Sequence, residues 1–242
     1  MAPRYSSVAI VGGGPSGISA VKALSEENIF SKISLFERRE KVGGTWLFDE
    51  EPEPFSTYPT QPQPSPPSHL PAFGDPKPEN VTSRTGLYAA LDSNVGSEVM
   101  CFTYKPFPNV NSAASITRLG HQNFTRPWEI IANYLEEIAE PFTHLISLNT
   151  HVESVEKKSG KWVLTLRRTD HIFKGKRQDY WWQETFDAVV VASGHYSVPN
   201  VPKIPGLEEA VKARPSAFEH SKAYRSADNY VNKVLISPKV SC

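Results

Sequence analysis

Cysteine, surplus charge and long apolar runs are all scarce in this sequence of 242 residues. The two cysteines, Cys101 and Cys242, are too few for a disulfide framework, so we expect a reducing, cytoplasmic compartment. Basic and acidic residues number 26 each, and this zero net charge argues against a nucleic-acid-binding surface. The apolar run near the N-terminus is short and ends in glycines, so the sequence predicts neither a signal peptide nor a membrane span there.

The N-terminal segment has the pattern of a nucleotide-binding half-domain. The β-branched run 8–11 predicts a buried strand, and it is followed by Gly12-Gly13-Gly14-Pro15-Ser16-Gly17. In such a turn the first glycine permits a tight bend, the second lets the backbone approach a pyrophosphate, and the third lets the next helix pack closely. An ordinary turn would explain the glycines alone, but an apolar helical stripe (Ile18, Val21, Leu24) and a second strand follow them.

Glu37 falls at the end of that second strand, predicted over residues 32–36. It lies about 20 residues after the last glycine, where an acid can accept hydrogen bonds from the hydroxyls of a ribose. The alternative is a solvated charge at a strand end. We therefore predict an adenine dinucleotide with its diphosphate on the glycine turn and its sugar on Glu37.

The rest of the chain predicts an α/β protein with a small antiparallel meander. Residues 51–79 are rich in proline and predict an extended excursion over the surface, with a docking site for a proline-reading domain as the less favoured alternative. A short helical stretch is expected at 87–91 and a longer helix from Thr125. Three short antiparallel strands are expected at 152–155, 162–166 and 180–182, and a buried parallel strand at 186–192.

Several separate motifs, in order along the chain, resemble those of a flavin-containing monooxygenase, of the FAD- and NADPH-dependent fungal type. The resemblance runs from about residue 8 to residue 236, and it rests on five segments besides the glycine turn: Glu37-Arg38-Arg39, Gly43-Gly44-Thr45-Trp46, Leu91-Asp92-Ser93-Asn94, Ala192-Ser193-Gly194-His195-Tyr196 and His220-Ser221-Lys222-Ala223-Tyr224-Arg225. It implies a Rossmann-like FAD-binding domain over residues 1–206. A linker and the first strand of an NADPH-binding domain would follow at 207–242.

The resemblance also implies roles for individual residues. The cofactor-binding residues would be Gly12, Gly13, Gly14, Pro15, Ser16, Gly17, Glu37, Arg38, Gly44, Thr45, Trp46, Ser93, Val152, Ser193 and Gly194. Arg38 and Arg39 could instead bind the 2′-phosphate of NADPH, but the charge of Glu37 would repel that phosphate, so the first site is assigned to FAD. Asn94 would be the catalytic residue, its amide donating to the oxygenated flavin or holding the nicotinamide; the alternative is a turn residue that satisfies its own backbone. His220 is more often a packing or capping residue than an NADPH contact. His121, His144, His151 and His171 have no matching metal-ligand partners, so we expect no metal site.

The implied reaction is N- or S-oxygenation like that of N,N-dimethylaniline monooxygenase. NADPH would reduce FAD, O₂ would be captured as a C4a-hydroperoxyflavin, and one oxygen atom would pass to a small nucleophilic nitrogen or sulfur compound. Baeyer–Villiger oxygenation is a second reading, weakened because that group usually has tryptophan at the position of Tyr224. A catalytically silent FAD-binding fragment is a third, and a homo-oligomer stays open.

The C-terminus departs from the family pattern. Residues 232–236 resemble the first strand of an NADPH domain, but Pro238 follows and no second glycine-rich turn appears. We therefore expect a truncated form that holds the ADP half of FAD and cannot use NADPH alone.

Overall fold

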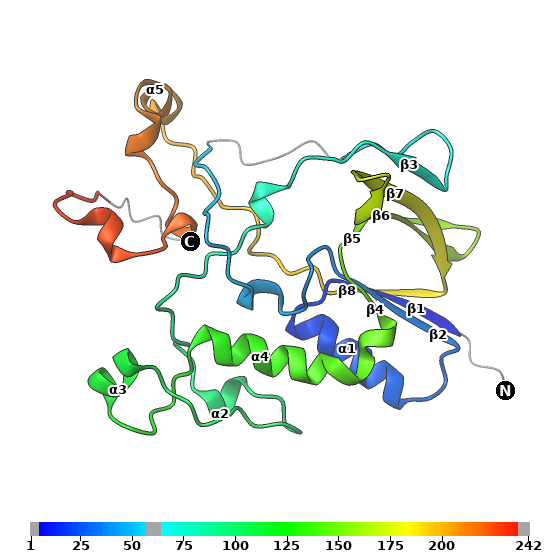
Figure 1. Ribbon diagram of the computed structural model, residues 1–242, viewed down its shortest axis with the longest axis horizontal. Coiled ribbons are helices and arrows are strands. Elements are labelled where there is room, and N and C mark those ends of the chain that lie inside the picture. The colour runs from blue at the N-terminus through cyan, green and yellow to red at the C-terminus, as the bar shows by residue number, and fades with distance from the viewer. Residues whose placement is uncertain (1–4, 57–63, 237–242) are drawn as a thin grey trace. The chain divides into compact units, whose positions relative to one another are not determined.

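The computed structural model describes residues 5–56 and 64–236 (Figure 1). Its contacts divide the chain into two compact units that interleave along the sequence. The first comprises Met1–Gly44, Pro62–Glu79 and Ala132–Gly194, and the second comprises Thr45–Gln61, Asn80–Ile131 and His195–Cys242. This division by contacts differs from the sequence-based boundary at residue 206, which stays a prediction.

A four-stranded parallel sheet forms the centre of the first unit. Its strand order is β4-β2-β1-β8, with the bounds Ile146–Ser147, Lys32–Phe36, Ser7–Val11 and Ala188–Val191. Helix α1 (Pro15–Glu26) packs its apolar stripe on this sheet, where Ile10, Val21 and Leu35 are fully buried together. The expected strand, glycine turn, helix and strand are therefore confirmed.

A second, antiparallel sheet completes this unit (Figure 1). Its order is β3-β7-β6-β5, with the bounds Ala72–Gly74, Lys176–Phe186, Lys161–Phe173 and Thr150–Lys158. The strands are longer than the sequence predicted. Tight hairpin turns join these strands, because Ser159-Gly160 and Lys174-Gly175 adopt positive φ at their two central positions. The α/β class with a Rossmann-like parallel sheet and an antiparallel meander is confirmed.

The two sheets share a core within the first unit. Ala9 and Phe36 from the parallel sheet pack with Leu164, Leu166 and Phe186 from the antiparallel sheet, and all five side chains are buried. The meander therefore shares apolar burial with the nucleotide-binding half of the unit, and folding one sheet stabilises the other.

The proline-rich segment lies partly outside the described residues, which omit 57–63. Its later part contributes β3, and among the described strands β3 pairs with β7 alone, at the edge of the antiparallel sheet. Ala72–Gly74 contains no proline, so its backbone groups can join the ladder, while the flanking prolines limit the strand to this short length. The expected extended path is thus combined with one short edge strand.

The helices of the remaining chain are mostly short. They are α2 (Ser97–Met100), α3 (Ala113–Leu119), α4 (Trp128–Ala139), α5 (Leu207–Ala213) and the 3₁₀ turns η1 (Gly44–Trp46), η2 (Val81–Ser83), η3 (Glu140–Leu145), η4 (Pro215–Ala217), η5 (Ser221–Ala223) and η6 (Ala227–Tyr230). Within the described residues, no helix is both long and apolar enough to cross a membrane.

Three local predictions were wrong. Residues 87–91 form a turn and not a helix, because five residues cannot offset the cost of helix nucleation without neighbours. The long helix starts at Trp128, since the Thr125 hydroxyl donates to the Asn123 side chain (2.7 Å) and does not cap the helix. Residues 232–236 form no strand, because no strand of the described chain pairs with them.

Candidate functional site

The glycine turn after β1 is closed by atoms that leave no room for side chains. Gly12 has φ +104°, and a Cβ added there would lie 2.5 Å from the carbonyl oxygen of Ala192. A Cβ added at Gly17 would lie 1.9 Å from the carbonyl oxygen of Gly12. Both distances are far below contact, so only glycine permits α1 to start so close to the exits of β1 and β8.

The N-terminus of α1 is available to an anion. Pro15 occupies the first turn, and Ile18 donates the first helical hydrogen bond to the carbonyl of Gly14 (3.0 Å). Within α1, all of which is described, Gly14 supplies no side-chain cap and the first turn has no acidic residue, while Ser16 is exposed. The unpaired N–H groups of the first turn and the helix dipole therefore fit a diphosphate.

Glu37 is buried at the end of β2, with 5% of its surface exposed. One carboxylate oxygen accepts a hydrogen bond from the N–H of Gly13 (2.5 Å), and the other accepts one from the N–H of Arg39 (2.9 Å). Each oxygen keeps a second lone pair that can accept a ribose hydroxyl. The acid thus fits the predicted role and also fixes the glycine turn, a structural role that spacing alone did not reveal.

A positive environment surrounds the neighbouring His151 on β5. Burial first, and then the charges of Arg167 and Arg38, lower the pKa of His151 to about 4. Arg167 is itself buried in ion pairs with Glu153 (2.6 Å) and Asp179 (2.8 Å). His151 is therefore neutral at pH 7, and the half-buried Arg38 lies near the end of β2.

The second glycine-containing segment, Gly43-Gly44, contacts the glycine turn after β1. The N–H of Gly43 donates to the carbonyl of Gly13 (2.9 Å), and Gly44 has φ +59° with no room for a Cβ beside Gly14. Thr45 and Trp46 follow directly in the chain but belong to the second unit, where Thr45 is exposed and Trp46 is half-buried.

The exit of β8 also lies against the glycine turn. The N–H of Ala192 donates to the carbonyl of Val11 (2.9 Å), which places Ser193 beside Gly12. Gly194 has φ +67°, and both Ser193 and Gly194 are exposed. The first unit therefore brings the glycine turn, Glu37, Gly44 and Ser193 to the carboxyl ends of parallel strands, where ligands of open α/β sheets bind.

Val152 stands apart from the other predicted cofactor residues of this unit. It is half-buried on β5 and packs against the shared core of the two sheets. The structure thus gives its side chain a packing role, and its part in binding the cofactor stays a prediction.

The loop with Ser93 and Asn94 lies in the second unit. Ser93 is buried, its N–H donates to the carbonyl of Arg126 (2.8 Å), and its hydroxyl donates to Val95 (2.9 Å) and accepts from the N–H of Arg126 (3.0 Å). Asn94 is exposed. Ser93 therefore anchors the loop with its own hydrogen bonds, and the Asn94 amide faces solvent.

The linker motif at 220–225 is tied to its own unit. The Nδ1 atom of His220 accepts the N–H of Lys222 (3.1 Å), so His220 caps η5, as the capping interpretation predicts. The ammonium of Lys222 is paired with the buried Glu53 and donates to the carbonyls of Thr82 (2.9 Å) and Ser197. Arg225 donates to the carbonyls of Asp49 (2.8 Å) and Thr85 (3.0 Å). These contacts hold the linker against three earlier segments of the chain, at 49–53, 82–85 and Ser197.

A parallel sheet with a glycine turn at the first helix and a buried acid after the second strand defines a dinucleotide-binding protein of the Rossmann type. The model of an NAD(P)-binding Rossmann-like domain matches residues 10–66. The model of the flavin-binding monooxygenase-like family matches residues 75–238, well over half of the chain. The chain belongs to the flavin-binding monooxygenase-like family.

Relatives and solved structures agree with this assignment. Flavin-containing monooxygenase FMO GS-OX5 of Arabidopsis thaliana is 29% identical over 95% of this chain, and flavin-containing monooxygenase ustF2 of Aspergillus flavus is 28% identical over 97%. The structure of S-allyl-L-cysteine S-oxygenase from Allium sativum matches 93% of the chain with a TM-score of 0.63 and 26% identity. The chain spans 43%, 49% and 43% of the lengths of these three proteins, respectively.

Proposed function

We propose that the first unit binds the ADP half of FAD for an S- or N-oxygenating flavin monooxygenase. One observation carries the proposal. Gly17 packs directly against the glycine turn, the buried carboxylate of Glu37 accepts a hydrogen bond from that turn, and the N-terminus of α1 beside them has no side-chain cap. Gly12 to Gly17 would hold the diphosphate, Glu37 the ribose and Arg38 the edge of the adenosine. Gly44, Ser193 and Gly194 would line the path toward the flavin.

The oxygen-activating chemistry of the family belongs to the flavin, which NADPH reduces. The protein supplies binding, orientation and exclusion of water. Thr45, Trp46 and Asn94 are our candidates for the residues next to the reacting part of the cofactor, with Asn94 as a hydrogen-bond donor. Sulfur is the favoured substrate atom because the relative from Allium sativum is named as an S-oxygenase. We place the protein in the cytoplasm, with O₂ and a small nucleophile as its partners.

The test is a set of binding titrations on the purified chain with FAD, ADP, FMN and 2′,5′-ADP. We expect FAD and ADP to bind, and FMN to bind at least ~10-fold more weakly, because it lacks the adenosine diphosphate. We expect 2′,5′-ADP to bind more weakly than ADP, since Glu37 repels its 2′-phosphate. Tighter binding of 2′,5′-ADP would assign the site to NADPH, and binding of FMN without ADP would remove the proposal.

A matched pair of variants locates the site. Gly17→Val should abolish binding of ADP because its side chain would strike the carbonyl of Gly12. Ser19→Ala, on the same helix, should leave binding unchanged. Circular dichroism spectra of both variants distinguish loss of the site from loss of the fold.

A further inference from the structure

The hairpin between β6 and β7 carries exposed apolar side chains at its tip (Figure 1). Ile172 and Phe173, the last residues of β6, are 62% and 52% exposed. Phe73, on the adjoining edge strand β3, is 52% exposed. We call these three side chains the apolar tip. Single apolar residues are common on protein surfaces, but a group of large ones at one end of a sheet marks a contact surface.

A row of aromatic rings connects the apolar tip to the core. The centroid of the Phe73 ring lies 4.7 Å from that of His171 and 4.9 Å from that of Tyr180. Tyr180 in turn stacks on Trp182 at 5.2 Å, and Trp182 packs against the shared core of the two sheets. Tyr180 and Trp182 are half-buried, and the indole N–H of Trp182 donates to Glu184 (2.8 Å). Tyrosine and tryptophan in such positions are typical of surfaces that meet a membrane interface, where one side is apolar and the other is wet.

The same end of the hairpin is positively charged. Residues 168–178 contain four cationic side chains and one carboxylate, an excess of three positive charges. The carboxylate of Asp170 lies 2.6 Å from Arg168, so these two neutralise each other. The remaining cations, which we call the cationic set, are all exposed: Lys174, Lys176 and Arg177. Within the described part of the chain no ion pair reaches the cationic set, and Asp75 and Lys77 after β3 add no net charge.

The hairpin between β5 and β6 has a basic turn of a different kind. There the ammonium of Lys158 lies 2.8 Å from Glu156, and the ammonium of Lys161 is paired with Asp187. Its central residues, Ser159-Gly160, carry no apolar side chain. Of these two hairpins, the one between β6 and β7 therefore combines unpaired positive charge with exposed apolar surface.

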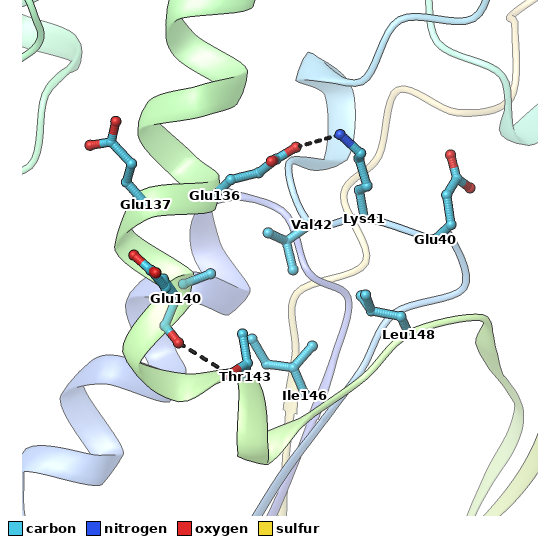
Figure 2. Close-up of a pocket in the computed structure, with 10 residues that line it drawn as sticks. Glu40, Lys41, Val42, Glu136, Glu137, Glu140, Thr143, Ile146 and Leu148 are labelled. Atoms are coloured by element: carbon cyan, nitrogen blue, oxygen red, sulfur yellow. Dashed lines mark hydrogen bonds and ion pairs between the residues drawn. The ribbon is translucent and has the colours of Figure 1, made fainter.

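Charge is unevenly distributed over the first unit. A pocket of about 400 Å³ between the loop after β2 and the end of α4 is lined by four glutamates and one lysine (Figure 2). That lysine, Lys41, lies 3.3 Å from the carboxylate of Glu136. The zero net charge of the chain thus conceals an acidic region at the pocket and a basic one at the hairpin tip. An anionic surface would be attracted to the tip and repelled by the pocket.

We propose that the tip of the β6–β7 hairpin binds the surface of an anionic phospholipid bilayer. The apolar tip would enter the boundary between headgroups and acyl chains, and the cationic set would contact the anionic headgroups around it. The two kinds of contact act together, because a few charges attract a surface only within about one Debye length, roughly 8 Å at physiological salt. The cytoplasmic leaflet carries the negative charge that this site requires, so the protein would be held at that surface without crossing it. This inference goes beyond the flavin proposal and does not depend on it.

The test is cosedimentation of the purified chain with vesicles of phosphatidylcholine that contain about 30% phosphatidylserine, an anionic fraction chosen to give a surface potential like that of the cytoplasmic leaflet. We expect binding to these mixed vesicles and at least ~10-fold weaker binding to pure phosphatidylcholine. Salt at about 0.5 M should release most of the protein, because it screens charges beyond a few ångströms. Equal binding to both kinds of vesicle, or binding to neither, would overturn the proposal.

Paired variants locate the site. Ile172→Ser with Phe173→Ser removes most of the apolar tip, and Lys174→Gln with Lys176→Gln removes two charges of the cationic set. Each pair should weaken binding to mixed vesicles by at least ~5-fold. The matched control is Lys157→Gln with Lys158→Gln, which removes two charges from the β5–β6 hairpin and should leave binding within about twofold. Equal weakening by both lysine pairs would show a general charge effect and contradict the site. Circular dichroism checks that every variant keeps its fold.

A duplex oligonucleotide tests the competing class of anionic partner. We expect the duplex not to displace mixed vesicles, because it offers the cationic set phosphates but gives the apolar tip no acyl region to enter. Displacement of the vesicles by the duplex, together with unchanged duplex binding by Ile172→Ser with Phe173→Ser, would assign the cations to nucleic acid and contradict the proposal. Since the vesicle assay needs no cofactor, failure of FAD to bind would leave its result unaffected.

Discussion

The buried carboxylate of Glu37 accepts a hydrogen bond from the backbone N–H of Gly13, so the acid after β2 and the glycine turn after β1 form one rigid arrangement. The same carboxylate holds the N–H of Arg39. Glu37 therefore shapes the turn before any ligand arrives. Preorganisation of this kind lowers the cost of binding, because the turn is already ordered.

Glu37→Ala should consequently destabilise the protein even without a cofactor. It leaves two backbone N–H groups without their acceptor in a buried place, and we expect a loss of about 1–3 kcal/mol in the free energy of unfolding. Urea denaturation of the cofactor-free variant measures this. Glu40→Ala, an exposed acid on the same loop, is the control and should stay within about 0.5 kcal/mol. An unchanged Glu37→Ala would show that the carboxylate serves only the ligand.

His151 makes stability depend on pH in a defined window. Its pKa is about 4 in the folded chain and 6.5 as the ordinary value, so the unfolded chain binds the proton more readily. The stabilisation is therefore complete above about pH 6.5, falls as the pH drops toward 4, and stays lost below it; a shift of this size is worth about 3 kcal/mol at most. Denaturation midpoints of wild type and His151→Gln between pH 7 and 4 measure this dependence. If both lose stability with the same slope, the effect does not come from His151.

Lys222 and Glu53 form a buried ion pair within the second unit, with 10% and 5% of their side chains exposed. Lys222→Met should cost about 3–5 kcal/mol because Glu53 keeps a buried charge without a partner. The double variant Lys222→Met with Glu53→Gln should recover part of that loss. The carbonyls of Thr82 and Ser197 would still lack their donor, so recovery is incomplete. A double variant as unstable as the sum of the single variants would show that the pair does not interact.

Asn94 and Ser93 should behave in opposite ways. Ser93→Ala removes the buried hydroxyl that bonds Val95 and Arg126, and it should destabilise the chain by about 1–3 kcal/mol. Asn94→Ala changes an exposed amide and should leave stability within about 0.5 kcal/mol. In a catalytically active form, Asn94→Ala should bind FAD yet release hydrogen peroxide in place of oxygenated product. Unchanged oxygenation would remove Asn94 from the catalytic site.

Local patterns in the sequence predict much of this fold. The sequence directly determines the apolar patterns of the strands and of helix α1, because these patterns depend on neighbouring residues. The same holds for the glycine turn and for the hairpins at Ser159-Gly160 and Lys174-Gly175. The short segments 87–91 and 232–236 were assigned wrongly because an isolated turn of helix or a lone strand is not stable without partners. The edge strand β3 was missed for the complementary reason, since its pairing with β7 outweighs the prolines around it.

The sequence by itself determined the dinucleotide half-domain, the position of its acid and the family to which the chain belongs. Only the tertiary structure decided that the Glu37 carboxylate also accepts a hydrogen bond from Gly13. It likewise decided that the cationic side chains of the 220–225 linker donate hydrogen bonds to carbonyls far away in the sequence. It also placed glutamates from the β2 loop and the end of α4 around one apolar pocket. Spacing along the chain carries the first kind of information, because strands and turns form from adjacent residues. The second kind needs folding, because burial and hydrogen bonding join residues far apart in sequence, and their partners exist only once the core has closed.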